Sequence, residues 1–388
     1  MTARQYRSHR GLLAAFDTFD APRAEFDAII VPTGRPAPYL RQAIAAAREH
    51  DVFLLLLCSR RSTIASAALE AKGAGVRALA IDIDEVDPGL VPPFATDQLL
   101  RETRFQRPTD TSFKRNLGLL IAALAGWQRI LFLDDDIDLP DTADLGVAAG
   151  LLGEFPVVGL ANAGMPDNSV VCHAIRDVGQ AQDTFIGGGA LAVGEAAFGS
   201  FFPNIYNEDW FFLLDGRDLR PSAVTGLAVQ KRYDPYRDAR RARGEELGDT
   251  LAEGVFGLFD SHLGLMHADE RYWREFFADR RRIIRETIAL VQRSKIEAGL
   301  RARMVDSLRA AIGRSELITP ELCTRYLRAW QADCVRWRRR ITELRRYHGG
   351  SGVEQAVGVL DLPSFAQAGV DVRVSTGRRR SAAPVARV

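Results

Sequence analysis

In Arg129-Ile-Leu-Phe-Leu-Asp-Asp-Asp-Ile-Asp-Leu-Pro140, an apolar run ends abruptly in three consecutive carboxylates. The pattern predicts a strand over 130–133 that is buried on both faces, with Asp134, Asp135 and Asp136 emerging at its carboxyl end. Ligands of open α/β sheets bind at that edge. Clustered carboxylates repel one another unless a cation compensates them, and hard oxygen ligands favour Mg²⁺ or Mn²⁺. The alternative is a solvated acidic turn that caps the next helix.

The composition is that of an ordinary globular protein that can bury one large core or two smaller ones. The chain has 388 residues, of which 47% are hydrophobic and 26% charged. Its 51 basic residues are matched by 50 acidic ones, so the overall charge gives no reason to expect a nucleic acid partner. The cysteines are scattered without metal-ligand spacing, which favours a reducing cytoplasm. We expect no signal peptide and no transmembrane segment.

The first part of the chain alternates between short apolar runs and amphipathic stretches, a pattern typical of βαβ units and a mainly parallel sheet. A further helix is expected from Ser112 to Gly126, directly before the acidic strand. Residues 155–212 are less regular and richer in Gly, Asn and Pro, which indicates long loops that line a site. The earlier predicted strands are 26–31, 52–58 and 76–83, and the helices between them are 38–49 and 64–72.

The last third of the sequence predicts helices that are rich in arginine. Residues 270–288 and 321–347 combine arginine with tryptophan and other apolar residues. These helices are expected to present solvated faces, and the alternative is contact with an anionic lipid surface or with a second subunit of a homo-oligomer. The expected organisation is an N-terminal extension (1–25), an α/β domain (26–268), a C-terminal helical subdomain (269–348) and a largely disordered Arg-containing tail (349–388).

Four segments together resemble a known enzyme family. They are Ile29-Ile-Val-Pro-Thr-Gly-Arg-Pro-Ala-Pro-Tyr-Leu-Arg-Gln-Ala-Ile44, Lys114-Arg-Asn-Leu-Gly118, Leu133-Asp-Asp-Asp136 and Asn207-Glu-Asp-Trp210. In this order they resemble the opening strand and loop, the Arg-Asn-x-Gly segment, the DxD motif and the Glu-Asp motif of family 2-type glycosyltransferases. The resemblance covers about residues 26–268. It implies the GT-A fold, a Rossmann-like mixed sheet flanked by helices, here with a C-terminal helical extension.

The resemblance assigns the first half of the domain to a nucleoside diphosphate sugar donor. Pro32 and Gly34 let the backbone turn after the first strand, so that the exposed loop can hold the base and ribose. A carboxylate near the third strand, Asp82 or else Asp84, would contact the base. Cations before the acidic strand can pair with the diphosphate. The alternatives to donor binding are that Arg35 is a solvated side chain and that Lys114 forms an ion pair with Asp110. The expected donor-binding residues are Pro32, Thr33, Arg35, Asp82, Lys114, Arg115, Asn116, Asp134 and Asp135.

The same resemblance implies a metal ion, Mn²⁺ or Mg²⁺. Asp134 would face the ribose or the metal, and Asp136 would bind the metal that bridges the donor phosphates. The metal would neutralise charge on the departing diphosphate. Family members frequently add a histidine ligand, for which we favour His262 over His267, with Asp260 as a supporting carboxylate. A hydrogen-bonded core or surface histidine is the alternative for each.

The acceptor side is expected around a glycine run and an acidic pair. Absence of side chains in the glycine run permits close approach of a sugar or phosphate, although a tight turn would use the same residues. The resemblance makes Asp209 the general base that deprotonates the acceptor, with Glu208 orienting it. A helix cap is the alternative for this pair. The expected acceptor-binding residues are Gly187, Gly188, Gly189 and Trp210.

The sequence therefore predicts a metal-dependent glycosyltransferase of the hexosyltransferase type that moves a sugar to an acceptor hydroxyl with inversion. Three alternatives stay open: a retaining GT-A enzyme, a sugar-nucleotide nucleotidyltransferase, and a non-catalytic scaffold with a GT-A-like shell. The chain lacks the Gln-x-x-Arg-Trp motif of processive members, which argues against a polymer-extruding synthase.

Overall fold

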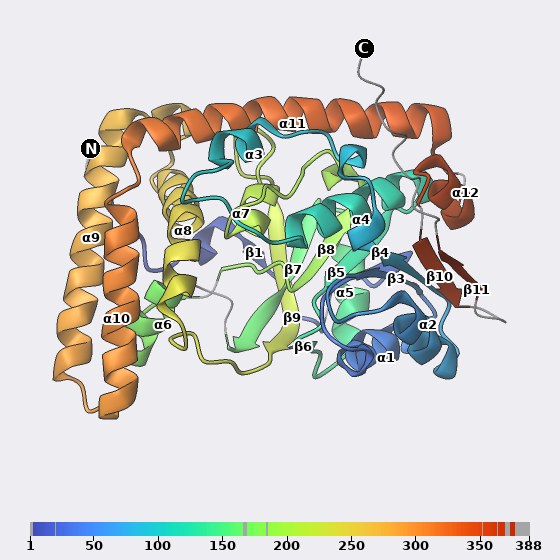
Figure 1. Ribbon diagram of the computed structural model, residues 1–388, viewed down its shortest axis with the longest axis horizontal. Helices are drawn as coiled ribbons and strands as arrows, with labels where there is room; N and C mark the ends of the chain where they lie inside the picture. The colour runs from blue at the N-terminus through green and yellow to red at the C-terminus, as the bar shows by residue number, and fades with distance from the viewer. Residues whose placement is uncertain are drawn as a thin grey trace, which may run out of the picture.

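A mixed sheet flanked by helices forms the centre of the protein in the computed structural model, as the sequence predicts (Figure 1). The structure describes residues 3–19, 21–165, 169–183, 185–350, 352–362, 364–368 and 373–376. Within them the strands follow the order β1-β9-β7-β8-β5-β2-β3-β4-β10-β11, and β6 pairs with β9. Their bounds are β1 (Ala14–Ala15), β2 (Ala28–Thr33), β3 (Phe53–Cys58), β4 (Ala78–Asp82), β5 (Arg129–Leu133), β6 (Ile137–Asp138), β7 (Val157–Gly164), β8 (Ala190–Gly194), β9 (Ser222–Gln230), β10 (Ser364–Ala368) and β11 (Arg373–Thr376).

Strands β2, β3, β4 and β5 are parallel, so their carboxyl ends lie at one edge of the sheet. They are apolar on both faces because helices cover both sides, which is why the sequence reads as continuous runs such as Phe-Leu-Leu-Leu-Leu-Cys in β3. Thr63 caps helix α2 by accepting from the amide of Ser66, and Gly126 ends helix α4 with a φ of 82°. The helices around this half are α1 (Arg41–Glu49), α2 (Ile64–Gly73), α3 (Ala95–Leu100), α4 (Thr111–Ala125) and α5 (Ala143–Leu151).

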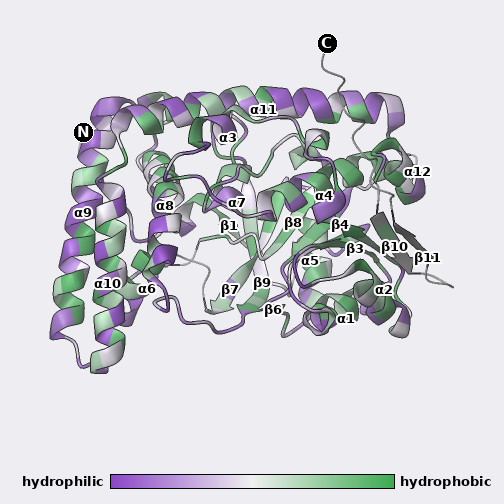
Figure 2. Ribbon diagram, in the orientation of Figure 1, coloured by the Kyte–Doolittle hydropathy of each residue, from purple (hydrophilic) through white to green (hydrophobic). Residues whose placement is uncertain are grey.

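Alternate residues of each strand face two different cores. On β5, Ile130 and Phe132 pack with helix α4, whereas Leu131 and Leu133 pack with helices α1, α2 and α5. This alternation is the expected period of two along a strand. The apolar strands form the green centre of Figure 2. The sheet is thus the middle layer of three.

Strand β8 runs antiparallel between β5 and β7. Its register places Ala190 opposite Leu133 and Gly194 opposite Arg129. The chain that enters β8 therefore lies beside the acidic end of β5, and the amide of Asp134 donates to the carbonyl of Gly189 at 2.8 Å. This connection brings the predicted glycine run next to the predicted metal motif.

Most of the chain after β9 is helical. Helices α9 and α10 lie side by side, and α11 crosses the molecule along the top of Figure 1. Helix α11 packs Trp330 against Phe211, and the indole of Trp337 donates to the carbonyl of Phe198 at 2.9 Å. The bounds are α6 (Val170–Asp177), α7 (Glu208–Phe212), α8 (Ala239–Asp260), α9 (Glu270–Arg293), α10 (Ala298–Ser315), α11 (Pro320–His348) and α12 (Gly352–Val359). Short 3₁₀ helices are η1 (Arg10–Leu12), η2 (Ala37–Leu40), η3 (Ile83–Glu85), η4 (Pro88–Leu90), η5 (Glu195–Ala197) and η6 (Leu265–His267).

The segment from 349 onward, for which the sequence predicts a disordered tail, contains regular structure where it is described. Helix α12 packs near α4, and β10 pairs antiparallel with the edge strand β4. Backbone pairing with an open sheet edge does not require an apolar sequence, so composition alone did not indicate it. The predicted tail residues 369–372 and 377–388 lie outside the described residues. None of the described helices is both long and apolar enough to cross a lipid bilayer.

Candidate functional site

A cleft of about 490 Å³ opens at the carboxyl edge of β2, β3 and β5. All three aspartates that follow β5 line it, together with residues from the loops after β2 and β3 and from the start of α4. The lining residues are Pro32, Gly34, Arg35, Arg60, Arg61, Thr109, Asp110, Thr111, Lys114, Asp134, Asp135 and Asp136. This is the edge at which parallel α/β sheets bind ligands.

The loop after β2 contacts two of the aspartates directly. The hydroxyl of Thr33 donates to Asp135 at 2.7 Å, and the Arg35 guanidinium also pairs with Asp135. The other terminal nitrogen of Arg35 donates to Asp136 Oδ2 at 3.0 Å. Arg35 therefore bridges neighbouring carboxylates and offsets part of their mutual repulsion, which is a more specific role than that of a solvated side chain.

Arg115 joins the metal-motif candidate to the acidic pair of α7. Its Nη2 donates to both oxygens of Asp134 at 3.0 and 3.1 Å, and its Nη1 donates to Glu208 at 2.9 Å. Arg107 contacts the second oxygen of Glu208 at 3.3 Å. Burial raises the pKa of Asp134 to about 7; the Arg115 charge opposes this rise and the Asp136 charge adds to it. One buried cation thus holds two carboxylates from distant segments, and its Nε has no hydrogen-bond partner among the residues that the structure describes.

Lys114 connects the ends of β2 and β3 to the start of α4. Its ammonium donates to the carbonyl of Thr33 at 2.8 Å and to Ser59 Oγ at 2.7 Å, and it pairs with Asp110 at 3.1 Å. Ser59 in turn donates to Asp110 at 2.6 Å. Burial lowers the pKa of Lys114, and the Asp110 charge opposes that effect. The ion pair between Lys114 and Asp110, which was the structural alternative from the sequence, is therefore present. Lys114 also lines the cleft.

The acidic pair begins helix α7 at a backbone position of unusual geometry. Asn207, just before the pair, has a φ of 58°, and both Glu208 and Asp209 are buried. Asp209 Oδ2 accepts from the amide of Gly188 at 2.6 Å. A Cβ on Gly188 would lie 2.5 Å from Arg115 Nη1, so only glycine leaves room for that guanidinium. Gly188, Arg115 and the acidic pair therefore form one connected group.

Several predicted donor and acceptor residues lie away from the cleft lining. The amide of Asn116 pairs with the backbone of Phe202 in both directions, at 2.9 and 2.8 Å. Asp82 accepts from the amide of Asp84 and caps η3. Trp210 is buried in an aromatic cluster, where it meets the His9 ring edge-to-face at 5.3 Å. Gly187 and Gly189 are buried or half-buried in the entry to β8.

The predicted histidine ligand lies at the end of α8. His262 is exposed with a φ of 58°, and its amide donates to the carbonyl of Phe259. It is not among the residues that line the cleft. His267 is exposed as well, and its Nδ1 contacts the carbonyl of Gly264 at 3.2 Å.

The donor set of the cleft suits a hard divalent cation because it consists of carboxylate oxygens. Among the described residues, the one trio of metal-binding groups within 4.8 Å of one another is Cys172, Asp249 and Glu253, which lies elsewhere. Asp249 in that trio is bonded to Arg280 at 2.7 Å and to Asn207. In the cleft, Asp134 and Asp136 are the carboxylates that would hold a cation, and each is paired with an arginine, Asp134 with Arg115 and Asp136 with Arg35.

The sequence reasoning missed two cations of the cleft, Arg60 and Arg61. They come two and three residues after the last residue of β3, so they lie at the same edge of the sheet as the aspartates. The signal that could have revealed them is the parallel pairing of β2 and β3, in which Thr33 lies opposite Cys58, so that the residues after both strands lie at the same edge. Guanidinium groups at such an edge can pair with an anionic ligand.

Comparisons with known proteins find distant structural similarity to solved structures and no match by sequence. No family model matches the sequence, and no curated protein matches it. Among solved structures, the chain is similar to the mannosyltransferase PcManGT from Pyrobaculum calidifontis in complex with GDP-Man and Mn²⁺. The sequence identity is 13% and the TM-score 0.41, and the alignment covers 86% of this chain and 90% of that one. A likeness of this degree does not identify a function.

Proposed function

We propose that the chain is a GT-A-fold glycosyltransferase that moves a sugar from a nucleoside diphosphate sugar to an acceptor hydroxyl with the help of a divalent cation. The single observation that carries the proposal is the connection from Asp134, which lines the cleft, through the buried Arg115 to the buried Glu208. This connection would link the carboxylates that are proposed to bind the metal to the acidic pair that contains the candidate base.

On the donor side, the exposed guanidinium groups of Arg60 and Arg61 line the cleft and would pair with the diphosphate. The buried ammonium of Lys114, which is bound to Thr33, Ser59 and Asp110, would add positive charge near it. Asp134 and Asp136 would hold Mg²⁺ or Mn²⁺. When bound, the cation offsets negative charge on the departing diphosphate. Arg35, which pairs with Asp135 and Asp136, would exchange these carboxylates for phosphate oxygens when donor enters.

On the acceptor side, Asp209 would accept the proton of the attacking hydroxyl as the new bond forms. The amide of Gly188 donates to Oδ2 of this carboxylate and the amide of Trp210 donates to its Oδ1, so two backbone amides fix its orientation. Arg107 and Arg115 hold Glu208 by both of its oxygens, so Glu208 orients the surrounding groups and is not itself a free base. Direct attack by the hydroxyl favours inversion at the anomeric carbon, and a retaining reaction is the alternative.

Two other classes make different predictions. A sugar-nucleotide nucleotidyltransferase would release pyrophosphate from a nucleoside triphosphate and a sugar phosphate. A non-catalytic scaffold would neither hydrolyse nor transfer a sugar. Assays for pyrophosphate release and for donor hydrolysis with and without a chelator separate these classes from the proposed transferase.

The experiment that tests the proposal is a thermal-shift screen of nucleoside diphosphates and their sugars with and without Mn²⁺. A ligand that binds the folded protein at about 100 times its Kd stabilises it by about 2.7 kcal/mol. We expect a shift that needs both nucleotide and metal and that Asp136→Asn abolishes.

The matched control is Asp138→Asn, since Asp138 lies two residues further along, is half exposed and pairs with Lys231 outside the cleft. This variant should keep the full shift. Equal nucleotide-dependent shifts in Asp136→Asn and Asp138→Asn, or no shift with any nucleotide, would refute the proposal.

A further inference from the structure

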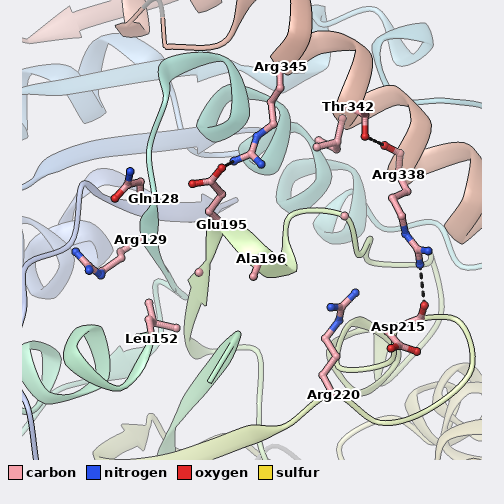
Figure 3. Close-up of a pocket in the computed structure, with 13 residues that line it drawn as sticks. Gln128, Arg129, Leu152, Glu195, Ala196, Asp215, Arg220, Arg338, Thr342 and Arg345 are labelled. Carbon is pink, nitrogen blue, oxygen red and sulfur yellow. Dashed lines mark hydrogen bonds and ion pairs between the residues drawn. The ribbon is translucent and has the colours of Figure 1, made fainter. Parts of the chain in front are cut away.

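A second cavity of about 860 Å³ lies at the opposite edge of the sheet from the aspartate cleft. It begins where β5 starts, at Arg129, and where β8 ends, at Gly194, and α11 forms its other side (Figure 3). The length of β5 separates it from the aspartates by roughly 16 Å, at about 3.3 Å per residue. The two cavities share no lining residue.

The second cavity is rich in arginine. Arg129, Arg220, Arg338 and Arg345 line it, whereas its carboxylates are those of Glu195 and Asp215. The lining therefore carries an excess of two positive charges. Arg345 pairs with Glu195 at 2.7 Å, as Figure 3 shows. The carboxylate of Asp215 accepts from two backbone amides, which hold it in its own turn.

Arg220 is held by its Nε, which leaves its two terminal nitrogens to donate to a ligand. Its Nε donates to Ser200 Oγ at 3.1 Å, and that hydroxyl donates to the carbonyl of Leu214. Within the described part of the chain, neither terminal nitrogen of Arg220 has a hydrogen-bond partner. Burial lowers the pKa of Arg220, the nearby Arg338 charge lowers it further, and Asp215 opposes both. A cation that is half-buried beside another cation is a group that an anion would stabilise.

The backbone on this side is shaped to receive Arg338 from α11. A Cβ on Gly199 would lie 3.3 Å from Arg338 Cγ, so the glycine lets the stem of the arginine lie flat. Gly216, with a φ of 99°, lies beneath its guanidinium, and Arg338 Nη2 donates to the carbonyl of Asp215 at 2.7 Å. Arg338 and Arg220 reach into the cavity from different elements and lie near one another in Figure 3.

We propose that this cavity binds a small phosphorylated molecule, with a phosphate group between Arg220 and Arg338. A phosphate dianion matches the two excess positive charges, whereas a carboxylate would supply only one. Guanidinium groups bind phosphate through paired N–H donors, and Arg220 presents such a pair. The volume is in the range of small-molecule sites, and Leu152 and Ile341 offer an apolar wall for the rest of the ligand. The bound phosphate would also join α11 to the sheet.

The test is titration calorimetry of the full chain with pyrophosphate, at constant ionic strength and with a chelator present. The wild type should bind, and Arg220→Gln should weaken binding by about tenfold or more because a charge-assisted hydrogen-bond pair is lost. Arg220→Lys keeps the charge but not the paired donors and should fall between the two. Arg339→Gln is the matched control, since this neighbour of Arg338 is exposed, pairs with Glu343 and lies outside the cavity; its affinity should equal that of the wild type.

Two further arms identify the site and the source of the phosphate. Arg60→Gln removes a cation of the aspartate cleft, where the proposed function also allows a diphosphate to bind. The binding that Arg220→Gln weakens should persist in Arg60→Gln, so failure of this proposal is separate from failure of the proposed function. Sedimentation with vesicles that contain phosphatidic acid should show no binding that depends on Arg220. Absence of pyrophosphate binding, equal affinity in Arg220→Gln, a loss confined to Arg60→Gln, or Arg220-dependent vesicle binding would each overturn the proposal.

Discussion

The buried histidine of the N-terminal segment should make the stability of the protein depend on pH in the alkaline range. His9 is 3% exposed and lies between Glu253, at 3.0 Å, and Asp260. Burial alone would lower the pKa of His9, but its hydrogen bonds with Asp260 and Glu253 outweigh burial and raise the pKa to about 9. The ring therefore carries a charge in the folded protein at neutral pH and packs edge-to-face against Phe185 and Trp210.

The size and sign of the effect follow from this pKa. In the unfolded chain a histidine titrates near 6.5, so the folded value of about 9 corresponds to about 3 kcal/mol. Because the folded pKa is the higher one, this stabilisation is fully present below about pH 6.5 and is lost as the pH rises through 9. The N-terminal segment should detach from α8 more easily at high pH.

The measurement is urea unfolding of the wild type and of His9→Gln from about pH 6 to about pH 10. The free energy of unfolding of the wild type should fall over this range by about 3 kcal/mol more than that of the variant. His50→Gln is the control, because the His50 ring contacts the carbonyl of Thr142 rather than a carboxylate, and it should follow the wild type. Parallel curves for His9→Gln and the wild type would show that His9 is not charged in the folded protein.

Three further substitutions test the site and its support. Gly188→Ala places a Cβ 2.5 Å from Arg115 Nη1 and should destabilise the protein by about 1–3 kcal/mol in urea unfolding, whereas Gly244→Ala, in an open position of helix α8, should stabilise it by about 0.5–1 kcal/mol. Asp209→Asn should lower kcat for sugar transfer by about 10²–10⁴-fold and leave nucleoside diphosphate affinity unchanged, since it removes the proposed base; an unchanged kcat would exclude that role. Asp333→Asn weakens the acceptor of two backbone amides at the start of α3 and should cost about 1–3 kcal/mol in the same unfolding assay; wild-type stability would show that these bonds contribute little.

Local pattern was sufficient to place the parallel half of the fold. The predicted strand at 52–58 is found as Phe53–Cys58, and the apolar run before the aspartates is β5. These elements are encoded by residues that are neighbours in the sequence, so periodicity reveals them. The position of the three aspartates at the carboxyl edge of the sheet could be predicted from the same strand, because β5 ends directly before Asp134.

Long-range pairing was beyond the reach of the same reasoning. Nothing near Arg115 indicates that its guanidinium joins Asp134 to Glu208, which lies 93 residues away along the chain. The amide of Asn116 belongs to the same short motif but turns to the backbone of Phe202, because adjacent residues on a helix face different directions. The pairing of β10 with β4 depends on an open edge that only the assembled sheet presents.

The late position of helix α11 in the sequence affects folding during synthesis on the ribosome. Its 29 residues cover aromatic side chains, such as Phe211 against Trp330, that come from the middle of the sequence. A chain that is still on the ribosome and lacks residues 320–348 leaves this apolar surface open to water. Because synthesis proceeds at about 5–20 residues per second, the unfinished protein stays exposed for seconds and would be a substrate for chaperones during that interval. The last long helix therefore closes the core as well as the second cavity.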